Sequence, residues 1–206
     1  MKLYDALYGS PPKHKVFISF HHADEAYKNY IERNWGESAD GLISESVCDG
    51  DIDPNLRTDA IWEKIRDEYI SDATVTLVLI GNDTWKRKYV DWEIGSSLRN
   101  TTRNSRTGLL GIVLPTYQST SWAGYQHPSM SKTENGGFYD PHTIPPRLYD
   151  NLLRGYAKIY SWEDDPQSVK EWIHNAYIMR NLCEPDQRRA WYDKNRNDQQ
   201  TEWRDN

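Results

Sequence analysis

The sequence predicts an α/β domain in which a central, mostly parallel β-sheet has helices on both faces, giving three layers. Two short apolar runs rich in β-branched residues, 74–80 and 109–114, are typical of strands buried on both faces. Segments with helical periodicity alternate with these and other strand-like runs. Such alternation implies parallel strands joined by right-handed crossovers.

The expected strands are short, apolar and followed by glycine, proline or a polar loop. The second is the weakest and suits an edge of the sheet, and the last is also expected at an edge. In chain order, the predicted strands are residues 15–20, 41–48, 74–80, 109–114 and 157–162.

Helices are expected between and after these strands. Asp24 is a suitable N-cap for the first helix, and Asp165 with Pro166 supplies an N-cap and an N1 proline for the last. Apolar residues at helical spacing predict a helix over 61–70, and another is expected to begin at Val90.

A single domain is expected over residues 15–182, after a lead-in of residues 1–14. Residues 117–146 are rich in Ser, Thr, Gly, Pro and Tyr without periodicity, so they are expected to form an insertion without regular structure. Residues 183–206 are polar and are expected to form either a terminal helix or a frayed tail.

The composition argues against several classes of function. A formal charge of −6 disfavours a general nucleic-acid or anionic-membrane binder. Cys48 and Cys183 are far apart, and the six histidines form no ligand motif, so no metal is expected. The chain has no apolar signal sequence and no run of about 18 apolar residues, so a cytoplasmic protein that does not enter membranes is expected.

Glu93 is the leading candidate for the residue that carries the chemistry. Its helix starts above the C-terminal end of strand 74–80, where open α/β sheets bind ligands. At about 100° per residue, Glu93 flanks the buried stripe formed by Val90, Ile94 and Leu98, so its carboxylate should be partly desolvated. By pattern alone, the alternative is an ordinary first-turn glutamate stabilised by the helix dipole.

Other polar residues are expected at the same rim. His21 and His22 follow the first strand and Asp49 follows the second, although such residues more often simply form a polar loop or turn. The basic run 86–88 could meet a phosphate or form a solvated surface. The chain contains no GxGxxG, GxxxxGK[ST] or GxSxG motif, which argues against ordinary dinucleotide dehydrogenases, P-loop NTPases and α/β-hydrolases.

Residues 15–24, 74–80 and 88–94 together resemble a bacterial TIR-like domain, and most closely the ThsB branch, the TIR component of Thoeris anti-phage defence. The opening VFISF is similar to the first TIR strand. Residues 89–93 (YVDWE) stand where many TIR domains have Trp-Cys-x-x-Glu at the start of the third helix, with Tyr and Val replacing Trp and Cys. The resemblance covers residues 15–115 well and 155–182 loosely.

The resemblance implies a flavodoxin-like fold and an enzyme that cleaves the nicotinamide–ribose bond of NAD+. Glu93 would be the catalytic glutamate, and Phe20, His21, Asp49 and Trp92 would line the pocket. NAD+ is then the substrate, so no further cofactor is expected. One carboxylate could stabilise an oxocarbenium-like ribose, and aromatic walls that exclude water would favour cyclisation over hydrolysis.

The resemblance further implies a cyclic ADP-ribose-type or related signal that activates a separate effector protein. The sequence leaves hydrolysis and cyclisation both open. The alternative is a non-catalytic scaffold that assembles with TIR or effector chains through TIR-like surfaces, which nine Trp and 14 Tyr and the insertion at 117–146 would suit. A receiver-like regulator is less consistent, because histidines and not carboxylates follow the first strand.

Overall fold

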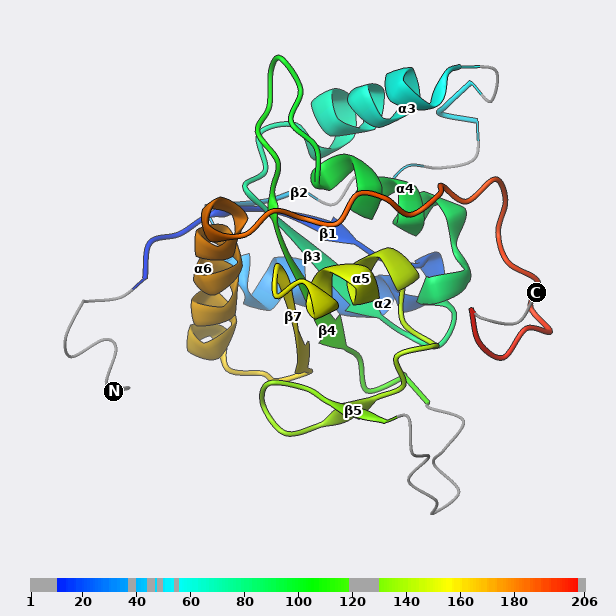
Figure 1. Ribbon diagram of the computed structural model, residues 1–206. Coiled ribbons are helices and arrows are strands. Elements are labelled where there is room, and N and C mark those ends of the chain that lie inside the picture. Colours follow the sequence, from blue (N-terminus) through cyan, green and yellow to red (C-terminus); the bar gives the residue numbers. More distant parts are fainter. Residues whose placement is uncertain are drawn as a thin grey trace.

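A computed structural model describes residues 11–36, 40–43, 47, 50–53, 56–118 and 130–203. Its centre is a five-stranded sheet in which every neighbouring pair of strands is parallel, which confirms the predicted fold class (Figure 1). From one edge to the other, the strands are β2 (Gly41–Ile43), β1 (Lys15–Ser19), β3 (Val75–Ile80), β4 (Gly108–Val113) and β7 (Ala157–Ser161).

Helices cover both faces of this sheet. Helices α2 and α6 pack on one face, and α3, α4 and α5 pack on the other. The helices are α2 (Glu25–Asn34), α3 (Thr58–Lys64), α4 (Lys88–Ser97), α5 (Pro146–Leu153) and α6 (Pro166–Leu182). The π-helix η3 (Ile65–Ile70) continues α3, and η1 (His22–Asp24) and η4 (Thr84–Lys86) are single 3-10 turns. Within the described ranges, no helix has the length and hydrophobicity needed to cross a bilayer.

The central strand β3 is buried along its whole length. Because side chains alternate between the faces of a strand, Leu77 and Leu79 contact the α2/α6 layer while Val78 and Ile80 contact α4 and α5. This double burial explains why the sequence of β3 is almost continuously apolar and not alternating.

Two predicted helix starts have different outcomes. The carboxylate of Asp165 accepts hydrogen bonds from the amides of Gln167 (3.2 Å) and Ser168 (3.3 Å), which confirms it as the N-cap of α6. Asp24 occupies the predicted N-cap position of α2, but its side chain makes no capping hydrogen bond to that helix. Its carboxylate instead faces Thr84 and Thr116 across the sheet rim.

The predicted insertion contains more regular structure than its sequence suggested. Strands β5 (Ser131–Lys132) and β6 (Phe138–Tyr139) pair as an antiparallel ribbon, and α5 begins at the end of the segment. Two-residue strands are too short to show a periodic pattern. The signals for α5 were Pro146 in its first turn and Gly155 beyond its end, where a φ of +73° favours glycine.

The C-terminal segment is neither a helix nor a frayed tail. Residues 183–203, hereafter the C-terminal strap, cross the outer faces of α4 and α5 (Figure 1, orange to red). Close approach is possible because α4 has glycine at position 95, where a Cβ atom would lie 2.8 Å from the ring of Trp191. The strap therefore forms an additional layer over the helix that carries Glu93.

A buried ion pair joins α4, α5 and the strap. The Arg147 guanidinium donates to both carboxylate oxygens of Asp91 (3.0 and 3.1 Å), and these side chains are 1% and 3% exposed. Arg147 also donates to the carbonyls of Arg189 (3.1 Å) and Ala190 (3.2 Å), and the amide of Tyr192 donates to Asp91 (3.1 Å). Both charges are therefore hydrogen-bonded as well as paired, as buried charges require.

We expect Asp91→Ala to lower the free energy of unfolding by about 3–5 kcal/mol, because it leaves the Arg147 guanidinium buried without its carboxylate. Urea unfolding followed by circular dichroism measures the change. Asp59→Ala is the matched control, because Asp59 belongs to an exposed pair with Arg57 on the outer helix α3. Equal effects of the two substitutions would contradict the structural role given to Asp91.

Candidate functional site

Glu93 lies inside α4, and its carboxylate is held against the end of β1. The hydroxyl of Ser19, the last residue of β1, donates to Oε2 at 2.6 Å, and the amide of Val47 donates to Oε1 at 2.9 Å. The residue is 1% exposed. Hydrogen bonds from neutral donors to both oxygens hold this carboxylate in one orientation.

The position of Glu93 argues against an ordinary first-turn glutamate that is stabilised by the helix dipole. Helix α4 begins at Lys88 and not at Val90, so Glu93 lies beyond the first turn, where the dipole effect has fallen off. Val90, Ile94 and Leu98 are buried against the sheet, as predicted. Glu93 is fully buried and not partly exposed, because Val47 and the α3 layer cover that side of the helix.

Phe20 and His21 directly follow the strand that holds Glu93. Phe20 is half-buried and packs against the α2/α6 core. His21 is also half-buried, and burial together with the nearby positive charge of Arg87 lowers its pKa to about 4. His21 is therefore neutral near pH 7, where its ring can both donate and accept hydrogen bonds.

The other two predicted pocket residues are placed differently. Asp49 lies outside the described residues. Trp92 is buried at 9% exposure with Phe17 and Ile65, and its indole N–H donates to the carbonyl of Tyr192 on the strap (2.8 Å). The structure thus brings Phe20 and His21 to the strand end that contacts Glu93, whereas Trp92 joins α4 to the strap.

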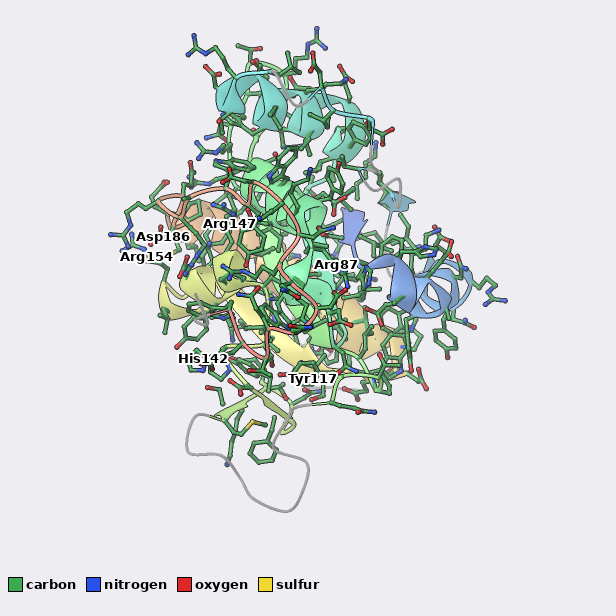
Figure 2. All side chains as sticks on the ribbon, turned by 90° about the vertical axis from the view of Figure 1, so that its right-hand side faces the viewer. Arg87, Tyr117, His142, Arg147, Arg154 and Asp186 are labelled. Carbon is green, nitrogen blue, oxygen red and sulfur yellow. The ribbon has the colours of Figure 1, made fainter. Side chains whose placement is uncertain are left out.

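The basic run beside the site is not a freely solvated surface. Lys86 is 7% exposed, and its ammonium group contacts the Asp83 carboxylate (2.9 Å) and donates to the carbonyl of Asp198 (3.0 Å). Arg87 immediately precedes α4 and is half-buried near His21, on the side of α4 that faces β1 and α2 (Figure 2).

Asp24 is a rim residue whose position sequence reasoning missed. It is 5% exposed, and Thr84 (3.5 Å) and Thr116 (3.3 Å), which follow β3 and β4, donate to its carboxylate. Burial raises its pKa despite these hydrogen bonds. Gly81 allows this approach, because a Cβ atom there would lie 2.2 Å from an Asp24 oxygen. The sequence did not reveal this contact, because Asp24 lies at the start of a helix, where an aspartate is expected as a cap.

The rim therefore combines a buried carboxylate, a neutral imidazole and a guanidinium within one group of strand ends. A carboxylate can stabilise developing positive charge, and a guanidinium can bind an anion. Among the described residues, no group of three or more His, Cys, Asp or Glu side chains could hold a metal ion.

Comparisons with known proteins agree on one family. A family model described as "Thoeris protein ThsB, TIR-like domain" matches residues 17–119, which is 103 of the 206 residues. A protein of Bacillus cereus (strain MSX-D12), named "Putative cyclic ADP-D-ribose synthase ThsB1", is 24% identical over 199 residues. That match covers 78% of this chain and 98% of the relative.

NMR titration of the His21 ring should give a pKa of about 4, well below the ordinary histidine value of 6.5. Arg87→Ala should raise this pKa while leaving it below 6.5, because burial is the larger cause and the Arg87 charge the smaller. Arg188→Ala, on the exposed strap surface, is the control. A wild-type pKa of 6.5, or no response to Arg87→Ala, would contradict this geometry.

The lowered pKa of His21 also determines how the free energy of unfolding changes with pH. Between about pH 6.5 and 4, the folded state binds fewer protons at His21 than the unfolded chain. The contribution of His21 to the free energy of unfolding is therefore complete above this window and is lost as the pH falls through it.

Proposed function

This chain belongs to the ThsB TIR-like domain family of the Thoeris system, and on that premise we propose that it cleaves the nicotinamide–ribose bond of NAD+. The observation that carries the proposal is the Glu93 carboxylate, held by Ser19 and Val47 at the C-terminal end of the parallel strands. That end of an open α/β sheet is where such folds bind ligands.

The reaction makes a limited chemical demand on the protein. The bond between C1′ and the nicotinamide nitrogen breaks, and its electron pair leaves with the nicotinamide, which departs neutral. The ribose then carries oxocarbenium-like positive charge, which the Glu93 carboxylate stabilises. Attack of water on C1′ releases a proton and gives ADP-ribose, whereas attack of an adenine nitrogen followed by loss of a proton gives a cyclic product.

We favour the cyclic ADP-ribose-type product. The Bacillus cereus relative is named as a cyclic ADP-D-ribose synthase, although it is distant at 24% identity. The neutral ring of His21, next to the strand end that contacts Glu93, supplies half-buried surface that could exclude water from the cleaved ribose, whereas Phe20 packs on the α2/α6 face of the sheet. The product would then act as a signal for a separate effector protein in anti-phage defence, and self-association is proposed as a further property.

The burial of Glu93 places a condition on this proposal. At 1% exposure the carboxylate is covered, and the Val47 amide bonds its Oε1. We therefore expect substrate binding to move the Val47 amide away from Oε1 and so uncover the carboxylate. A ribose hydroxyl would replace the amide as the hydrogen-bond donor.

The same burial favours a second candidate function, a non-catalytic interaction module. In that case Glu93 is structural, and its hydrogen bonds tie α4 to β1 and to the loop at Val47. Turnover of NAD+ by the purified protein separates the two functions, provided that the protein is assayed at high concentration so that any self-association is complete.

Glu93→Gln should lower kcat for NAD+ by on the order of 10²-fold or more, because the substitution removes the charge that stabilises the ribose cation. Mass spectrometry of the products measures the rate and separates ADP-ribose from cyclic forms. Glu63→Gln, on the exposed side of α3, is the matched control and should leave kcat unchanged.

Equal turnover by wild type and Glu93→Gln would remove Glu93 from catalysis. Absence of any wild-type turnover, combined with a loss of stability in Glu93→Gln, would favour the interaction module.

A further inference from the structure

Resting on the proposed function, we propose that Arg87 binds the diphosphate of NAD+ and that Asn195 and Asp198 of the C-terminal strap occupy this anion site in the absence of substrate. The geometry that points to this is an incompletely hydrogen-bonded guanidinium at the start of the Glu93 helix. The exposed Asp198 of the strap approaches this guanidinium, and Asn195 of the strap bonds the main-chain amide of the next residue, Lys88.

The guanidinium of Arg87 has unused hydrogen-bonding capacity. Its side chain is 23% exposed, and its Nε atom is buried without a hydrogen-bond partner among the residues that the structure describes. The carboxylate of Asp198 approaches Nη2 at 3.7 Å, which is too long for a hydrogen bond. A guanidinium has five donors in a planar fork that matches two phosphate oxygens. An anion with several oxygens would therefore satisfy donors that the strap does not.

Arg87 is also at a suitable distance from the proposed reaction. Glu93 follows it by six residues, or about 9 Å along a helix at 1.5 Å per residue. Both ends of this stretch lie near the end of β1, because Glu93 accepts a hydrogen bond from Ser19 and Arg87 is close enough to His21 for its charge to lower the His21 pKa. The diphosphate is attached to the 5′ oxygen of the ribose that is cleaved, so its binding group must lie close to, but not at, the reacting carbon.

The strap places oxygen atoms where an anion would bind. Asn195 Oδ1 accepts a hydrogen bond from the amide of Lys88 (2.8 Å), the first residue of α4, where the helix dipole favours negative charge. Asp198 lies beside Arg87, and its side chain is 83% exposed. A loose ion pair with an exposed carboxylate is weak. A diphosphate making charge-assisted hydrogen bonds can therefore displace it.

The test compares NAD+ with nicotinamide riboside, which has the cleaved bond but no diphosphate. Arg87→Ala should raise KM for NAD+ about tenfold, the equivalent of one lost charge-assisted interaction, and leave KM for the riboside unchanged. Arg87→Lys should recover only part of the loss, because lysine keeps the charge without the fork. Arg188→Ala, whose guanidinium pairs with Asp186 on the strap, is the control and should behave as wild type.

A second measurement does not depend on turnover. Calorimetric titration with ADP-ribose, which carries the diphosphate but no nicotinamide, should show about tenfold weaker binding to Arg87→Ala than to wild type. If wild type binds ADP-ribose in this Arg87-dependent way but does not cleave NAD+, the proposed function fails and the anion site stands. Unchanged ADP-ribose affinity in Arg87→Ala, or equal effects on NAD+ and the riboside, would overturn the anion site.

The strap has its own test. Asp198→Asn should tighten ADP-ribose binding and lower KM for NAD+, because it removes the carboxylate that competes for Arg87. Asp193→Asn removes the same charge from the same strap and is the matched control, expected to change neither value. Equal responses of the two variants, or none in Asp198→Asn, would overturn the competing role of the strap.

Discussion

The buried pair of Asp91 with Arg147 is the interaction on which the surroundings of the candidate site depend. Asp91 lies two residues before Glu93 on α4, and the Arg147 guanidinium comes from α5. The same two side chains bond the main chain of the strap at Ala190 and Tyr192. Helix α4 is thereby held between the sheet on one side and the strap on the other. Its Glu93 carboxylate is fixed toward Ser19 by this sandwich as well as by its own hydrogen bonds.

The sequence predicted the sheet and most of the helices because burial dictates their composition. Parallel strands covered on both faces are apolar at nearly every position, as β3 and β4 are, with Thr76 the polar exception in β3. Helix α5 was missed because only part of it is apolar and its buried face includes Arg147 and Asn151. The strap could not be predicted, because its contacts are largely hydrogen bonds between side chains and main-chain groups. These bonds join residues 35 to 112 positions apart and leave no periodic pattern.

The sequence was sufficient to predict at which strand end the candidate site lies, but not which groups contact each other there. Topology places the residues after β1 beside the start of α4, which is why Glu93 and His21 could be assigned to one rim. Phe20 was named only through the resemblance to TIR-like domains. The donors to Glu93 could not be named, since a strand-end serine and the amide of Val47 carry no chemical signature in sequence. From sequence, Arg87 was more consistent with a solvated charge than with an anion ligand, and only its partial burial near His21 changes that interpretation.

The most direct test of the central claim, that Glu93 faces the ribose of NAD+, is a crystal structure with an NAD+ analogue in which a carbocycle replaces that ribose and cannot be cleaved. Hydroxyl groups of this ring should lie within about 3 Å of the Glu93 carboxylate, with the Val47 amide displaced from it. The claim would be contradicted by an analogue bound elsewhere while Glu93 keeps its hydrogen bonds to Ser19 and Val47.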